Sequence, residues 1–179
     1  MAAVDPHNFR DVCGRFTTGV AAITSFGPEG PAGMTANAVA SLSLDPPMVV
    51  VCFDRTSRTL TAVEHSRRFG VNFLSHEQEP LAAVFASKRP ESEKFSEVQW
   101  SERSRVPAPD GCIGGIACEL RELVPGGDHL IGIGDVIEVW SGPGEPLVFF
   151  EGSYWTLEDR VVAPREVDRA LEGPSSGGA

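Results

Sequence analysis

Short runs of apolar and β-branched residues, separated by turn-forming residues, predict a structure made mainly of β-strands. One run covers residues 20–26 and ends at 27–30, where two glycines and a proline indicate a turn. The same pattern predicts further strands at residues 39–44, 48–53, 69–74, 114–123, 129–140, 146–150 and 153–157. Strands that are this short and this closely spaced are typical of an antiparallel barrel or sandwich.

Three segments have features of helices. The first begins at Asp5 and Pro6, because the carboxylate can accept a free backbone N–H and proline fits the first helical position. The second covers residues 57–65, where Ser57 is expected to cap the start, and the third covers 77–85. The apolar residues of the first segment recur at helical spacing: Phe9, Val12, Cys13 and Phe16.

Residues 87–110 are polar and charged, and they predict a long excursion over the surface. Phe95, Val98 and Trp100 are isolated apolar residues in this stretch and are expected to pin it to the body of the protein. Long loops of this kind often border a functional site.

With 179 residues, of which 41% are hydrophobic, the chain can bury the core of one ordinary domain. We expect that domain to cover residues 1–157. An amphipathic fragment at 161–171 runs into a Gly-, Ser- and Pro-containing end. Residues 158–179 are therefore expected to form a C-terminal helical fragment and a flexible tail.

The charge balance argues against nucleic acid and anionic membranes as partners. There are 15 Lys and Arg against 25 Asp and Glu, which gives a formal net charge of -10. The N-terminus lacks a basic targeting segment, and the longest apolar run, residues 46–53, is too short to span a bilayer. The four cysteines have no CxxC spacing and are interpreted as reduced thiols, so we expect a cytoplasmic protein.

Several signatures of common enzyme classes do not occur in the sequence. It contains no Gly-rich phosphate loop followed by Lys and Ser or Thr and no HExxH. The four histidines do not have metal-ligand spacing, so no metal site is expected.

Small and hydroxyl-bearing residues instead gather near the ends of predicted strands. They lie at residues 17–20, 33–38, 41–47, 54–59 and 69–74. Small residues allow a flat ligand to approach backbone N–H groups. Around the predicted helix start, hydroxyls, guanidinium groups and free N–H donors can hold a phosphate: Arg55, Ser57, Arg58 and Thr59.

The order and spacing of these segments resemble the flavin reductase-like, FMN-binding split-barrel family. That family includes the reductase components of two-component flavin-dependent monooxygenases. The most specific match is Gly33-Met34-Thr35-Ala36-Asn37 followed by Ser41-Leu42-Ser43-Leu44-Asp45-Pro46-Pro47, and the resemblance covers roughly residues 7 to 157. It implies a mainly β fold with flanking helices, arranged as an antiparallel split β-barrel.

The resemblance also implies roles for individual residues. Thr35, Ala36 and Asn37 would follow the isoalloxazine and ribityl chain, with Ser41 nearby, and Thr18, Met34 and Asn72 belong to matching segments. Ser57 and Thr59, helped by Arg55 or Arg58, would hold the flavin phosphate, and Lys94 and Phe95 would close over it. His129 and Tyr154 match positions on the nicotinamide side, where His129 would position the dinucleotide.

The activity implied is that of an NADH-dependent flavin reductase. FAD or FMN would be reduced by hydride transfer and passed to a separate monooxygenase, and the family implies a homodimer. The sequence leaves the choice of flavin open. NADH is preferred to NADPH because the sequence has no obvious basic cluster that could bind the ribose phosphate of NADPH.

Two other functions fit the same residues. The protein could be a non-enzymatic split-barrel protein that binds flavin or haem, or an oxidoreductase that keeps its flavin tightly bound. Ordinary structural roles are also open: Asn37 can satisfy a turn, Ser57 can cap a helix and His129 can be an exposed loop residue.

Overall fold

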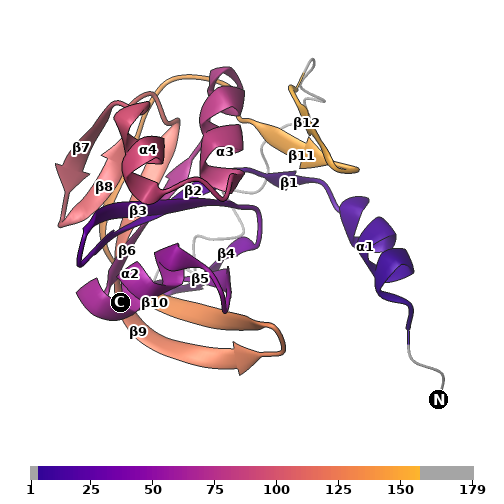
Figure 1. Cartoon of the computed structure of the whole chain (residues 1–179), viewed down its shortest axis with the longest axis horizontal. Coiled ribbons are helices and arrows are strands. Elements are labelled where there is room, and N and C mark those ends of the chain that lie inside the picture. Colours follow the sequence, from indigo (N-terminus) through magenta and orange to yellow (C-terminus); the bar gives the residue numbers. More distant parts are fainter. Residues whose placement is uncertain (1–3, 158–179) are drawn as a thin grey trace, which may run out of the picture.

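A computed structural model describes residues 4–157, and most of its regular structure is antiparallel β-sheet (Figure 1). The helices are α1 (Pro6–Gly14), α2 (Arg58–Ser66), the 3-10 turn η1 (His76–Gln78), α3 (Glu79–Ala86) and α4 (Glu91–Ser96). The strands are β1 (Thr18–Gly19), β2 (Ala21–Gly27), β3 (Gly30–Ala36), β4 (Val39–Leu44), β5 (Pro47–Asp54), β6 (Arg68–Phe73), β7 (Trp100–Arg103), β8 (Val106–Pro109), β9 (Gly114–Gly126), β10 (His129–Ser141), β11 (Val148–Phe150) and β12 (Ser153–Trp155).

Seven strands form the main sheet, in the order β3-β2-β6-β9-β10-β5-β4. The two edge strands, β3 and β4, follow each other in the sequence, and only Asn37 and Ala38 join them. Because two residues span only about 7 Å even when extended, the edges must meet at this point and the sheet must curl. The result is an open, or split, antiparallel barrel, which confirms the predicted fold class.

Two smaller sheets complete the β-structure. Strand β1 pairs with β11, where Thr18 lies opposite Phe149, and β11 pairs with β12. Strands β7 and β8 form a separate hairpin. Helix α2 contacts β2 and β3, and α3 and α4 contact β3 on the side away from α2 (Figure 1).

Strand β2 separates two hydrophobic cores. Ala21 and Ile23 pack into the first core, inside the barrel, whereas Val20 and Ala22 pack into the second, with residues of α3 and α4. This division follows from the pleat, because successive side chains of a strand point to opposite faces. The burial of both faces explains why residues 20–23 are continuously apolar.

Close packing inside the barrel depends on two glycines in β10. The rings of Phe53 and Phe69 meet edge to face with centroids 6.1 Å apart. A Cβ at Gly132 would lie 2.6 Å from the Phe53 ring, and a Cβ at Gly134 would lie 2.8 Å from the Cβ of Cys118. These glycines therefore make room for the aromatic core.

All four cysteines are free thiols, as the sequence predicts. Burial raises the pKa of the Cys112 thiol to about 11 and that of the Cys118 thiol to about 12. Both are therefore protonated and unreactive in the folded protein near neutral pH.

The predicted strands and helices are confirmed, with bounds that differ by a few residues, but the predicted cap is wrong. The Ser57 side chain makes no capping hydrogen bond to α2, because its hydroxyl donates to the Met34 sulfur instead. Phe95, Val98 and Trp100 attach residues 87–110 to the second core, as predicted, but this stretch also contains α4, β7 and β8, which the sequence did not predict.

The predicted C-terminal fragment and tail, residues 158–179, lie outside the described residues. Among residues 4–157, no helix is long and apolar enough to cross a membrane.

We predict that Gly134→Ala lowers the free energy of unfolding by about 1–3 kcal/mol, because the new methyl group overpacks the core. Gly19→Ala is the matched control, because a Cβ there meets nothing within 4 Å. Urea unfolding of the two variants and the wild type measures the difference. Equal stability of the two variants would contradict this account of the core.

Candidate functional site

A cavity of about 800 Å³ lies where the two edges of the barrel meet. We call it the seam cavity. Its walls come from α1, β1, the β3–β4 connection, β4 and β5, together with the segment before β11. Four residues predicted to bind flavin line it: Thr18, Ala36, Asn37 and Ser41.

The lining of the seam cavity suits a flat ring system with polar edges. Ala36, Ala38 and Gly19 leave the backbone accessible because their side chains are small or absent. The hydroxyl of Thr18 is buried and has no hydrogen-bond partner. A buried hydroxyl without a partner is costly, but this oxygen is not accessible from the cavity and does not by itself identify a ligand contact.

A second group of predicted residues surrounds the start of α2. The Ser57 hydroxyl donates to the Met34 sulfur at 3.3 Å, which joins the helix start to β3. Arg55 donates from Nε to the Gly127 carbonyl at 2.9 Å. Hydrogen bonds from Thr56 lower the pKa of the Asp54 carboxyl, so the loop and its two flanking residues hold a fixed negative charge as well as two arginines.

Long-range strand pairing places His129 beside this loop. His129 begins β10, and its Cα pairs with that of Asp54 at the end of β5. The backbone N–H of Arg55 also donates to the Asp128 carbonyl at 3.2 Å. The Asp128 carboxylate lies 2.8 Å from Nδ1 of His129, and this hydrogen bond lowers the pKa of Asp128. The His129 ring is thus held by its neighbour and remains partly exposed.

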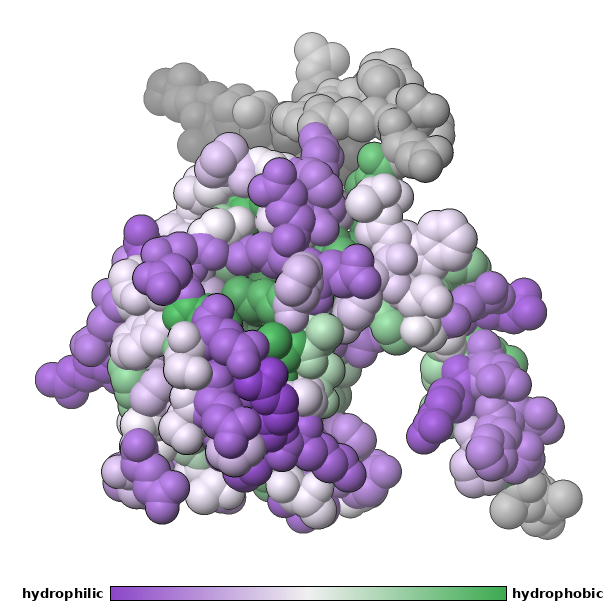
Figure 2. Space-filling model, turned by 45° about the horizontal axis from the view of Figure 1, so that its top comes forward, coloured by the Kyte–Doolittle hydropathy of each residue, from purple (hydrophilic) through white to green (hydrophobic). Residues whose placement is uncertain are grey.

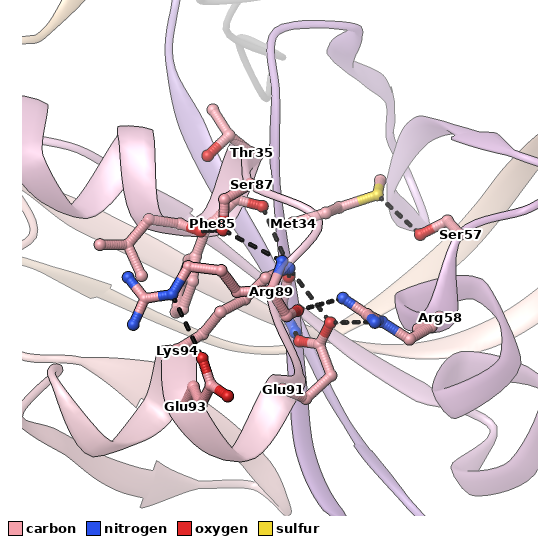
Figure 3. Close-up of polar contacts among 12 residues, drawn as sticks. Met34, Thr35, Ser57, Arg58, Phe85, Ser87, Arg89, Glu91, Glu93 and Lys94 are labelled. Carbon is pink, nitrogen blue, oxygen red and sulfur yellow. Dashed lines mark hydrogen bonds and ion pairs between the residues drawn. The ribbon is translucent and has the colours of Figure 1, made fainter.

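Glu91 connects three parts of the site, although the sequence analysis did not single it out (Figure 3). One carboxylate oxygen accepts from Arg58 Nε at 3.0 Å and from Lys94 Nζ at 3.1 Å. The other accepts from the backbone N–H of Gly33 at 2.9 Å. Pro90 followed by an acidic residue is a helix-start signal that could have identified α4 in this polar stretch.

Some predicted residues lie in the interior and do not face either group. Thr59 and Asn72 are fully buried, and the Asn72 side-chain amide donates to the Ala22 carbonyl and to Thr24. Lys94 is also buried, and its ammonium donates to the Gly33 and Phe85 carbonyls. Phe95 packs in the second core.

Thr35 and Tyr154 have partners of their own. The Thr35 hydroxyl donates to the Ala82 carbonyl at 2.6 Å, which ties β3 to α3. Tyr154 packs edge to face on Phe149, in the same small sheet as Thr18. The structure therefore separates Tyr154 from His129, which belongs to the main sheet. Within residues 4–157, no three His, Cys, Asp or Glu side chains converge as a metal site requires.

The chain forms an open antiparallel barrel with a cavity lined by small residues at its seam. Hydroxyl and guanidinium groups lie at a neighbouring helix start. These features define a nucleotide-cofactor-binding split barrel. Residues 13–158 match the model of the flavin reductase like domain, and the chain belongs to this family.

Named relatives agree with this assignment. The chain is 38% identical over 164 residues to the reductase subunit HsaB of a flavin-dependent monooxygenase from Rhodococcus jostii, covering 90% of this chain and 83% of that protein. It is 35% identical to an NADH-dependent flavin reductase from a Rhodococcus species, covering 87% of this chain and 88% of that protein.

A solved structure is similar over most of its length. The NADH:FAD oxidoreductase SgcE6 of Streptomyces globisporus superposes with a TM-score of 0.80 at 32% identity, covering 92% of this chain and 96% of that one. Together these findings confirm the resemblance drawn from the sequence. They also confirm the prediction of an oxidoreductase that uses flavin and NADH, rather than a non-enzymatic split-barrel protein.

We predict that Glu91→Ala lowers the free energy of unfolding by about 2–3 kcal/mol, because it leaves the buried Lys94 ammonium without its counter-ion. Glu93→Ala is the control from the same helix, since Glu93 is exposed and lies 3.6 Å from Arg89. Its expected effect is within about 0.5 kcal/mol.

Urea unfolding provides the measurement for both variants. Replacing Lys94 by Met in the Glu91→Ala background is expected to restore part of the loss, because both charges are then removed. Equal stability of Glu91→Ala and Glu93→Ala would show that Glu91 does not support Lys94.

Proposed function

We propose that this protein reduces a flavin with NADH and passes the reduced flavin to a separate monooxygenase. The observation that carries the proposal is the seam cavity, which small residues line together with Thr18, Asn37 and Ser41. Strand β3 runs from this cavity to the Met34–Ser57 contact at the start of α2. One flavin nucleotide could therefore use both groups of residues.

The residues available at the two places suit different parts of the flavin. Thr18, Ala36, Asn37 and Ser41 would hold the ring system through backbone groups and short polar side chains. Ser57, with Arg55 or Arg58, would hold the phosphate, because these side chains provide hydroxyl and guanidinium donors. Thr59 is buried and Lys94 is engaged within the protein, so the proposal assigns neither of them a direct contact.

A bound flavin would supply the hydride acceptor, so the role of the protein would mainly be to orient the cofactors and to provide electrostatic stabilisation. His129 lies beside Arg55, close to the residues proposed to hold the phosphate, and is partly exposed. Its role would be to bind and orient the dinucleotide rather than to transfer a proton. The Arg58 side chain is half exposed, which favours a flavin that can leave after reduction.

The release of reduced flavin fits the kind of protein that this chain resembles. HsaB is named as the reductase subunit of a monooxygenase, and we propose the same division of labour here. We also propose that the protein works in the cytosol, where its four free thiols stay reduced.

The decisive assay follows aerobic NADH oxidation by flavin-free protein, alone and then with FMN or FAD. We expect the rate to depend on added flavin, because exchange of the flavin is part of the proposed function. Equal rates with and without flavin would overturn the proposal. Protein that stays yellow through gel filtration and turns over without added flavin would instead support a tightly bound flavin.

Two variants test the proposed division between Ser57 and His129. Ser57→Ala should raise the flavin Kd by about tenfold, since hydrogen bonds to charged groups contribute about 1.5–3 kcal/mol. His129→Ala should raise the KM for NADH and leave the flavin Kd nearly unchanged. Flavin titration and steady-state kinetics measure both effects. Loss of flavin binding in His129→Ala would refute its proposed role.

We further propose that the protein is a homodimer in which α1 packs against the second copy. Helix α1 has no buried residue, and Figure 2 shows it standing apart from the body of the molecule. Phe9, Val12 and Phe16 are 63%, 68% and 78% exposed. Burying such side chains contributes about 1.5–3 kcal/mol each, which favours covering the apolar residues of α1 and the segment that follows it.

Light scattering after size exclusion tests the homodimer. The wild type should have twice the chain mass of 19.1 kDa, and Phe9→Glu should shift the protein towards the monomer. Arg10→Glu, on the same helix, should keep the dimer because it adds no charge to the apolar residues. A monomeric wild type would overturn the proposal.

A further inference from the structure

His129 follows directly on the turn that joins β9 to β10. Leu123 on β9 and Leu130 on β10 pack against the first core, whereas residues 125–128 lie beyond them and are exposed. We call residues 125–128 the hairpin turn, and Figure 1 shows it at the lower edge of the molecule. Core packing holds the two strands, so the turn needs other contacts to keep its place.

Arg55 ties the hairpin turn to the loop before α2. Its backbone N–H donates to the Asp128 carbonyl at 3.2 Å, and its side-chain Nε donates to the Gly127 carbonyl at 2.9 Å. The first hydrogen bond continues the pairing of Asp54 with His129 and does not depend on the side chain at position 55. The second requires a side-chain donor, so it is the contact that the residue type decides.

The Asp128 carboxylate orients the His129 ring only relative to the hairpin turn. It lies 2.8 Å from Nδ1 of His129, and the Asp128 side chain is 93% exposed. A contact between two neighbours in the chain moves with both of them. The position of His129 relative to the start of α2 therefore depends on the link through Arg55.

Ser57 and Arg58 are directed towards other elements. The Ser57 hydroxyl donates to the Met34 sulfur in β3, and Arg58 donates to Glu91 in α4 (Figure 3). Arg55 instead reaches the hairpin turn. These contacts separate two side chains that are held near β3 and α4 from one that is held near His129.

We propose that Arg55 is a positioning residue for His129 and not a ligand of the flavin phosphate. By holding the hairpin turn against the loop before α2, Arg55 keeps the His129 ring where the nicotinamide dinucleotide binds. Ser57 and Arg58 are then left to hold the phosphate. This inference rests on the proposed function, because it requires the role of His129 in binding NADH.

Two substitutions of Arg55 separate the two roles. Glutamine carries its amide nitrogen the same number of bonds from Cα as arginine carries Nε, so Arg55→Gln removes the charge and keeps a donor for the Gly127 carbonyl. Methionine has a similar length and no donor, so Arg55→Met removes both. Arg55 is exposed, so neither change disturbs the core. Arg121→Met is the matched control, because Arg121 is exposed on β9 and binds Asp135 rather than the hairpin turn.

Steady-state kinetics with NADH and titration with FMN measure the outcome. We expect Arg55→Met to raise the KM for NADH by about fivefold, as for the loss of one hydrogen bond, with kcat nearly unchanged. The FMN Kd should stay within about twofold of the wild-type value. Arg55→Gln should bring the KM back to within about twofold of wild type, and Arg121→Met should change neither KM nor Kd.

A double-mutant cycle shows whether Arg55 acts through His129. In the His129→Ala background, Arg55→Met should have no further effect on the KM for NADH, because the ring that the turn positions is gone. A merely structural role of Arg55 would not make its effect depend on the His129 side chain.

A raised FMN Kd in both Arg55→Met and Arg55→Gln would overturn the inference, because loss of the charge would then weaken phosphate binding. An unchanged KM in Arg55→Met, or additive effects of Arg55→Met and His129→Ala, would also overturn it. These results would leave the proposed function intact. An unchanged KM in His129→Ala would instead refute the role of His129 in the proposed function, and this inference with it.

Discussion

The two-residue connection between β3 and β4 is the constraint on which the rest of the structure depends. Asn37 and Ala38 join strands that lie at opposite edges of a seven-stranded sheet, so the sheet has to curl until those edges meet. The seam cavity lies at this meeting point. The most specific sequence motif and the seam cavity therefore occupy one place for one geometric reason.

Edge strand β3 also organises the neighbouring elements. Its exposed backbone groups would be free to pair with another strand, but at Gly33 the N–H binds Glu91 and the carbonyl binds Lys94. The same carboxylate holds Arg58 at the start of α2. One ion-pair network thus protects a sheet edge and fixes a cation beside the candidate binding groups.

The candidate site was only partly predictable from residue types. Four of the residues selected by the motifs, Thr18, Ala36, Asn37 and Ser41, line one cavity, because strand order and a short connection control their positions. The same matching also selected Thr59, Asn72 and Lys94, whose side chains are buried. A motif gives the kind of residue at a position, whereas the direction of its side chain depends on packing from distant segments.

The sequence by itself determined most of the local elements, because alternation of apolar residues, turn-forming glycines and prolines and the Asp5–Pro6 helix start act over a few residues. It did not predict β3, α4, β7 or β8. Only the tertiary structure decided that His129 lies beside Asp54 and that Glu91 joins Gly33, Arg58 and Lys94. These contacts join residues far apart in the chain. Strand register and helix packing determine these contacts, and neither can be predicted from a local pattern in the sequence.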